Sequence, residues 1–179
     1  MTPDRLKRIL EGALMAAQRP LSIEDLERLF EADAARPERT DIREALRIIA
    51  ESCEDRGYHL KEVASGYRFQ VDEELAPWVS RLWEEKPPRY SRALLETLAL
   101  IAYRQPITRA EIEEVRGVAV SSHIIRTLTE RDWIRVVGHK ELPGRPALFG
   151  TTRGFLDYFN LRSLDELPTL AELKERPTP

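Results

Sequence analysis

The stretch LEGALMAAQRPLSIEDL, residues 10–26, returns in modified form as LETLALIAYRQPITRAEI, residues 95–112. Each copy holds an apolar helical run, a proline that ends it, one apolar residue, and a hydroxyl residue followed three places later by an acid. The second copy has one residue added at the turn. The hydroxyl accepts a hydrogen bond from a first-turn amide and the acid accepts one from the cap amide, so a second helix must begin there. Two copies of one rare pattern predict two small domains of the same kind.

Outward from the first copy, the apolar spacing predicts three helices followed by a β-hairpin. The helices are expected over residues 4–17, over 22–30 and from Thr40 or Asp41 to Cys53, the strands over 58–63 and 67–71, and a further helix over 72–84. Three helices followed by a hairpin is the element order of a winged helix, in which the hairpin is the wing. Two adjacent prolines, Pro87 and Pro88, favour an extended spacer and mark the domain boundary.

The second copy repeats this order. We expect helices over 91–103, 108–116 and 121–131, strands over 133–137 and 147–151 around a wing tip at 138–146, and a last helix over 153–159. The fold class is therefore mainly α with small β-hairpins (α+β): two tandem winged-helix domains over residues 1–86 and 87–160. Leucines then recur at every third position from Leu161 to Leu173, interrupted by Pro168, which predicts an extended or disordered tail over 161–179. A further hypothesis places these leucines against their own domain or a neighbouring one.

The charge of the chain argues against nucleic acid as its main partner. The net charge is −3, with 14 basic and 19 acidic side chains in residues 1–86 and 14 and 12 in residues 87–179. The pI is about 5.8, whereas a domain that holds DNA phosphates usually has a pI above about 9. Strong non-specific DNA binding by the isolated chain is therefore not expected.

The remaining composition excludes several other classes. No run of about 18 apolar residues exists, so no membrane span is expected, and the N-terminal residues lack the apolar core of a signal peptide. Cys53 is the single cysteine and lies on an apolar helical stripe, which indicates a buried thiol and fits a reducing cytosol. No nucleophile–base–orienter set, metal-ligand spacing or phosphate-binding glycine loop is present, so we expect no catalytic site, no metal and no cofactor.

Two kinds of partner remain open at this point. The third helix and wing of the second copy could contact phosphates and base edges through Ser121, Ser122, His123, Arg126, Thr127, Arg131, His139, Lys140 and Arg145. Acidic residues interleave with this set and would repel phosphate, which favours a protein partner instead. In the first copy, Tyr67, Phe69, Trp78 and Trp83 provide aromatic area either for a dimer interface or for the core of the domain itself.

The second copy also carries a family resemblance. Residues 91–109 (SRALLETLALIAYRQPITR), followed by the motifs RGV, PGRP, FGTT, FLDYF and LRSLDELP, resemble segregation and condensation protein B, an accessory subunit of the bacterial SMC–kleisin complex. The resemblance implies a homodimer through the N-terminal winged helices. It also implies that the C-terminal winged helices hold the kleisin, segregation and condensation protein A, and through it join the SMC ATPase. Such a subunit has no catalysis of its own, supports chromosome condensation and segregation in the cytoplasm at the nucleoid, and contacts DNA weakly or indirectly.

The functional surface is expected in the second domain. We predict partner-binding roles there for Arg92, Glu96, Tyr103, Gln105, Arg116, Arg126 and Arg145. A winged-helix transcription regulator that reads DNA is the alternative function. Asn160 stands where the family commonly has glycine, and asparagine tolerates the left-handed conformation that a helix end needs.

Overall fold

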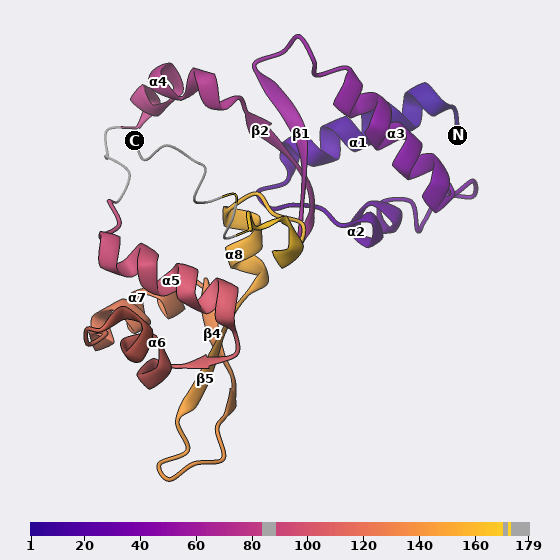
Figure 1. The fold of residues 1–179 in the computed structure, drawn as a ribbon. Coiled ribbons are helices and arrows are strands. Elements are labelled where there is room, and N and C mark those ends of the chain that lie inside the picture. The colour runs from indigo at the N-terminus through magenta and orange to yellow at the C-terminus, as the bar shows by residue number, and fades with distance from the viewer. Residues whose placement is uncertain (84–88, 170–171, 173–179) are drawn as a thin grey trace. The chain divides into compact units, whose positions relative to one another are not determined.

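Figure 1 shows the computed structural model of the chain, which describes residues 1–83, 89–169 and 172. The chain divides into two compact units, Met1–Lys86 and Pro87–Pro179. Most of the spacer expected at residues 86–89, and residues 170–171 and 173–179 of the expected tail, lie outside the described residues. No helix in the described part of the chain combines the length and apolar character that crossing a membrane requires.

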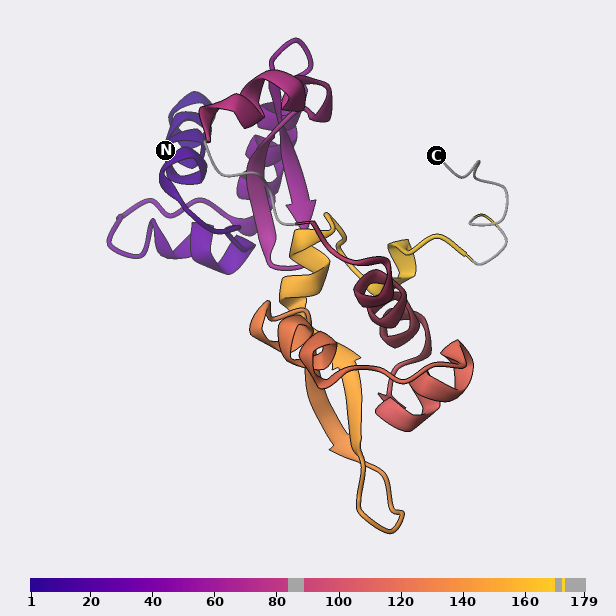
Figure 2. The ribbon, with the colours of Figure 1, turned by 90° about the vertical axis from the view of Figure 1, so that its left-hand side faces the viewer.

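The first unit is a winged helix, as the sequence predicts. Its elements are α1 (Pro3–Ala16), α2 (Ile23–Arg28), α3 (Arg39–Glu51), β1 (Tyr58–Val63) and β2 (Gly66–Val71). The two strands pair antiparallel from Tyr58 with Val71 to Val63 with Gly66, and Leu21 forms an isolated bridge to Tyr67. The hairpin lies beside α1 and α3 (Figure 2).

Two details of the first unit differ from expectation. Helix α3 begins earlier than Thr40 or Asp41, because the Asp41 carboxylate accepts from the Glu38 amide at 3.0 Å and so makes Glu38 the cap. The single helix expected over 72–84 is instead three short turns: η1 (Glu73–Leu75), α4 (Ala76–Val79) and η2 (Ser80–Leu82). Pro77 lacks an amide hydrogen. It can therefore stand in the first turn of α4, but it interrupts a helix that begins at residue 72.

The second unit is also a winged helix. Its elements are α5 (Arg92–Arg104), β3 (Ile107–Thr108), α6 (Arg109–Arg116), α7 (Ser122–Glu130), β4 (Ile134–His139), β5 (Ala147–Thr151), α8 (Arg153–Tyr158) and η3 (Leu164–Glu166). The strands form an antiparallel sheet in the order β3-β5-β4. The β4–β5 hairpin projects beyond the helices of its unit as the wing (Figure 1).

Both copies pair with their hairpin between the first two helices, through the two-residue strand β3 in the second unit and through a single bridge in the first, and neither pairing is expected from the sequence. In the second unit Ile107 pairs with Phe149, and in the first unit Leu21 pairs with Tyr67. One or two residues are too few to show the alternation by which a strand is recognised. Both capping boxes are confirmed: the Asp25 amide donates to Ser22 Oγ at 3.0 Å and the Glu111 amide to Thr108 Oγ1 at 3.3 Å.

Each unit has its own hydrophobic core. In the first, Leu10, Leu26 and Ile42 are fully buried, and in the second Ile101, Ile112 and Leu128 are. Burying one such side chain stabilises a fold by about 1.5–3 kcal/mol. Two separate cores explain why the repeat in the sequence becomes two units rather than one.

The aromatic residues of the first unit differ in their burial. Tyr67 and Phe69 pack against the core, whereas Trp78 and Trp83 are 62% and 63% exposed. Cys53 is buried and its thiol donates to the Ile49 carbonyl at 3.2 Å.

The segment after α8 differs from the extended or disordered tail that the leucine spacing predicts. Asn160 adopts a left-handed conformation with φ 60°, which turns the chain after the helix. Leu161, Leu164 and Leu167 then pack against the core of the second unit, and η3 forms between them. Burial of apolar area holds these residues onto their own domain, because leucines three apart meet one surface in a compact turn.

Glu111 gives the second unit a pH dependence that can be measured. Its pKa falls to about 2 because Lys140 Nζ donates to the carboxylate, as do the Thr108 amide and hydroxyl. An unfolded glutamate has a pKa of about 4.3, so this contribution to stability is complete above that value and is lost as the pH falls through about 2. We expect the melting temperature of Glu111→Gln to fall less than that of the wild type between pH 5 and pH 2.

The matched control for this measurement is Glu114→Gln on the same helix. Among the described residues Glu114 has no hydrogen bond or ion pair through its carboxylate. The Glu114 variant should therefore keep the acid slope of the wild type, and equal slopes for both variants would contradict the role given to Glu111.

Candidate functional site

Helix α5 is the centre of the predicted site. Arg92, Glu96 and Tyr103 lie on it, and Gln105 caps its C-terminal end. Arg116 ends α6, Arg126 lies on α7 and Arg145 lies in the wing. Of these residues the structure joins Arg92, Glu96 and Arg116, and it leaves Arg126 and Arg145 on separate elements.

One carboxylate joins two arginines at the N-terminal half of α5. Arg92 Nε donates to Glu96 Oε1 at 2.8 Å, and Arg116 Nη2 donates to Glu96 Oε2 at 3.2 Å. These two guanidinium groups, Arg92 first, hold the pKa of Glu96 below its usual range. Two positive charges against one negative charge leave a local positive excess at this end of the helix.

Two of the predicted residues face their own protein rather than solvent. The Arg116 side chain is only 10% exposed and also donates to Thr97 Oγ1 at 3.3 Å, which ties α6 to α5. Gln105 Nε2 donates to Thr151 Oγ1 at 3.0 Å and Gln105 Oε1 accepts from the Thr151 amide at 2.8 Å, which ties the end of α5 to β5. Both side chains therefore stabilise the packing of α6 and β5 against α5.

Besides Arg92 and Glu96, whose side chains are exposed, three more predicted residues remain accessible. Tyr103 is 38% exposed, and its hydroxyl donates to the Pro168 carbonyl at 2.5 Å. Arg126 is exposed and has no ion pair with any described residue. Arg145 sits at the wing tip beside Gly144, both with positive φ, and its nearest carboxylate is Glu141 at 3.6 Å.

A shallow apolar groove of about 300 Å³ opens along α5, and we call it the α5–α8 groove. Helix α5 supplies one side of the groove through Leu95, Leu98, Ala99, Ala102 and Tyr103. The other side comes from α8 and the chain that follows it: Phe155, Phe159, Leu161, Leu167 and Pro168. Of the predicted residues only Tyr103 lines this groove.

The other residues of the groove are not among those predicted from the sequence. A signal for it was present: α5 is apolar around most of its circumference, with Leu95 and Ala99 in addition to the stripe that the core requires. A helix that is apolar on every side is normally covered on every side. Phe155 and Phe159 gave no comparable signal, because they reach the groove only once α8 has packed beside α5.

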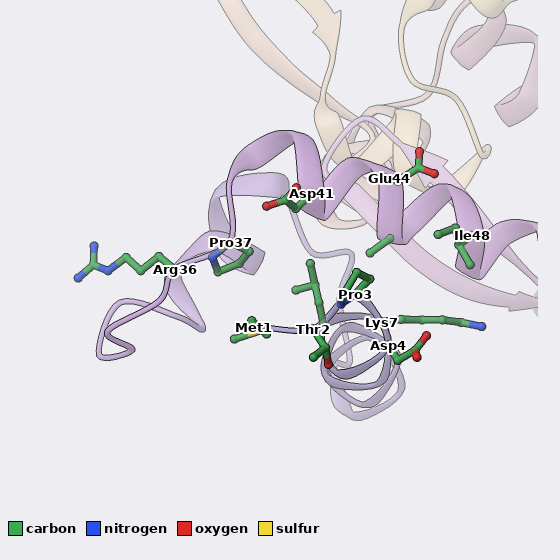
Figure 3. A pocket seen from close by; sticks show the side chains of 12 residues that line it. Met1, Thr2, Pro3, Asp4, Lys7, Arg36, Pro37, Asp41, Glu44 and Ile48 are labelled. Carbon is green, nitrogen blue, oxygen red and sulfur yellow. The ribbon is translucent and has the colours of Figure 1, made fainter.

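A second groove, of about 260 Å³, lies in the first unit between the start of α1 and the start of α3. Figure 3 shows Asp4 and Lys7 of α1 on one side and Asp41 and Glu44 of α3 on the other. Its lining mixes both signs of charge with apolar atoms. It offers a less uniform surface to an apolar partner than the α5–α8 groove does.

Several cations of the second winged helix contact groups of their own protein. Lys140 in the wing pairs with Glu111, and Arg109 pairs with Glu113 at 3.1 Å. The Arg131 guanidinium stacks over the rings of Tyr90 and Trp133, at 4.7 Å and 5.6 Å from their centres. Helix α7, the element that would enter a DNA groove, is left with Arg126 as its arginine and Glu130 close by.

The described residues contain no candidate metal site. Among them, no group of three or more histidine, cysteine, aspartate or glutamate side chains could hold a metal ion. Ser121 caps α7 by accepting from the Ile124 amide at 3.3 Å, which is a structural role.

Comparison with known proteins bears on the whole chain. The family model described as segregation and condensation complex subunit ScpB matches residues 8–170. A segregation and condensation protein B homolog of Coxiella burnetii (strain RSA 493 / Nine Mile phase I) is 58% identical over 168 residues, which cover 93% of this chain and 79% of that protein. Segregation and condensation protein B of Syntrophotalea carbinolica (strain DSM 2380 / NBRC 103641 / GraBd1) is 46% identical over 95% of this chain and 84% of its own length.

Among solved structures, the crystal structure of ScpB from Mycobacterium tuberculosis is 34% identical and covers 90% of this chain and 98% of its own, with a TM-score of 0.42. The family model spans nearly the entire chain, including both winged helices and the segment that folds back after α8. The chain belongs to the segregation and condensation protein B family.

Proposed function

We propose that this protein is a non-catalytic accessory subunit of a bacterial SMC–kleisin complex. In this proposal the first unit forms a homodimer and the second unit binds the kleisin, segregation and condensation protein A, through which the dimer joins the SMC ATPase. The protein then supports chromosome condensation and segregation from the cytoplasm, at the nucleoid, without a cofactor.

Family membership supports the complex, because the matching family is described as a subunit of it. The internal pairing of cations in the second winged helix favours a protein partner over DNA. Lys140 and Arg109 pair with Glu111 and Glu113, and the whole chain carries a net charge of −3, so the excess of positive charge that phosphate binding requires is small. Phosphate contacts supply most of non-specific DNA affinity.

The seven candidate residues take two roles within this proposal. Arg92, Glu96, Tyr103, Arg126 and Arg145 contact the partner. Gln105 and Arg116 position that surface from beneath, since each is bonded to its own domain. The alternative, a DNA-reading transcription regulator, would use Arg126 and Arg145 for phosphates.

Light scattering after size-exclusion chromatography tests the proposal directly. Alone, the protein should show twice the mass of its 20.7 kDa chain, and with the purified kleisin it should elute as a heavier complex. In a parallel titration, duplex DNA at physiological salt should bind with a Kd weaker than about 10⁻⁶ M and without sequence preference. If the protein is a monomer, does not bind the kleisin and binds one DNA sequence tightly, the alternative function as a transcription regulator is correct instead.

A matched pair of charge reversals refines this test. Arg126→Glu on α7 should weaken kleisin binding several-fold, since it turns an unpaired cation of the second unit into an anion. Arg43→Glu on α3 changes an exposed arginine on the third helix of the first unit and should leave kleisin affinity unchanged. Equal effects of the two would remove Arg126 from the binding surface.

A further inference from the structure

We propose that the α5–α8 groove of the second unit binds a continuous apolar helix with acidic residues near both ends, contributed by the kleisin. This inference rests on the function proposed above and assigns a place and a chemistry to its partner contact.

The apolar requirement comes from α5. One face of this helix packs into the core through Leu98 and Ile101, while Leu95, Ala99 and Tyr103 follow one another along the outer face at helical spacing. Leu95 and Tyr103 remain 44% and 38% exposed. Apolar side chains one turn apart on an open face are the surface into which an amphipathic helix lays its own apolar stripe.

The groove is already formed. The Tyr103 hydroxyl donates to the Pro168 carbonyl, so the segment that makes the far wall is attached to α5. Leu161 and Leu167 anchor the same segment in the core. A wall that is ordered before binding lowers the entropy cost of association.

The acidic ends of the ligand follow from charge at the ends of α5. At the N-terminal end Arg92 and Arg116 share the single carboxylate of Glu96, which leaves a positive excess. At the C-terminal end Arg104 is exposed and pairs with no carboxylate of the described residues. Arg104 lies 12 positions after Arg92 on α5, a distance of about 18 Å, which is a little over three turns of a bound helix.

The structure also argues against one segment of a second copy of this chain as the occupant. The most exposed aromatic residues of the first unit, Trp78 and Trp83, lie with Leu82 in the segment that Pro77 divides into short turns. Helix α4 within it has four residues, so this segment does not present a continuous helix of the required length.

Titration calorimetry of the full chain with the purified kleisin tests the inference. Leu95→Glu places a charge in the groove and should weaken the Kd about tenfold or more. Ala99→Glu also places a charge in the groove, at an exposed residue whose small side chain contributes little packing. A loss of binding in both variants is then not explained by lost packing of Leu95. Arg104→Glu should weaken binding and reduce its dependence on salt. Val115→Glu, on α6 and 45% exposed, is the matched control and should bind as the wild type does.

The outcomes separate this inference from the function on which it rests. If the wild type fails to bind the kleisin, the proposed function is wrong. If the wild type binds and both Leu95→Glu and Ala99→Glu bind equally well, with unchanged circular dichroism and melting temperature, the groove assignment is overturned. It is also overturned if these variants lose self-association in light scattering but keep the kleisin, because the occupant is then a second copy.

Discussion

Gly66→Ala is expected to lower the free energy of unfolding of the first unit by about 3–5 kcal/mol. Gly66 has a φ of 134°, a conformation that is nearly restricted to glycine. A Cβ built there would lie 2.2 Å from the Leu21 carbonyl oxygen and 2.6 Å from the Ser22 amide nitrogen. The backbone would have to move, and the two hydrogen bonds between Leu21 and Tyr67, at 2.9 Å and 2.8 Å, would be lost.

Gly12→Ala is the matched control for this change. Gly12 lies inside α1 and a Cβ added there meets no heavy atom within 4 Å. Alanine is favoured over glycine in a helix interior by about 0.5–1 kcal/mol, so this variant should be more stable than the wild type. Urea unfolding followed by circular dichroism measures both. Two variants with shifts of the same sign would refute the close approach of β2 to the turn before α2.

Trp133→Ala should lower the stability of the second unit by about 3–5 kcal/mol. Trp133 is 2% exposed, and its ring lies 5.1 Å from that of Tyr90, 4.7 Å from that of Tyr158 and 5.4 Å from that of Phe159. Removing it leaves a cavity at the point where β4, α8 and the start of the unit meet. The Arg131 guanidinium would also lose the face of one ring on which it stacks.

The control for Trp133→Ala is Trp78→Ala in the first unit. Because Trp78 is 62% exposed and belongs to the other unit, its loss should change the unfolding of the second unit by less than about 0.5 kcal/mol. Hydrogen exchange on peptides from β4 and α8 assigns the effect to the second unit. Unchanged protection of these peptides in Trp133→Ala would show that the aromatic cluster does not hold them.

The pair of winged helices is the part of the structure that the sequence predicts most fully. Each capping box acts over three residues, from Ser22 to Asp25 and from Thr108 to Glu111, so both partners are visible in the printed chain. The apolar spacing of each helix is equally local. Where a local rule was overlooked the prediction was wrong: Asp41 reaches back to cap α3 at Glu38, and Pro77 divides the helix expected over 72–84.

The candidate site followed the sequence less closely, because its contacts join distant parts of the chain. Arg116 and Gln105 resembled exposed polar residues in the sequence, yet their partners Glu96 and Thr151 lie 20 and 46 positions away. No periodicity within a helix reports such a partner. The orientation of these side chains appears only when α6 and β5 have packed against α5.

The sequence by itself determined that this chain makes two winged helices of one kind, since turns, caps and apolar stripes depend on near neighbours. Only the tertiary structure decided that residues 161–169 fold back, that Tyr103 and Pro168 meet across 65 positions, and that a groove opens between α5 and α8. The physical reason is that apolar burial has no direction along the chain. It selects whichever surfaces the connections allow to meet, and the groove is the part of that apolar surface that the chain leaves uncovered.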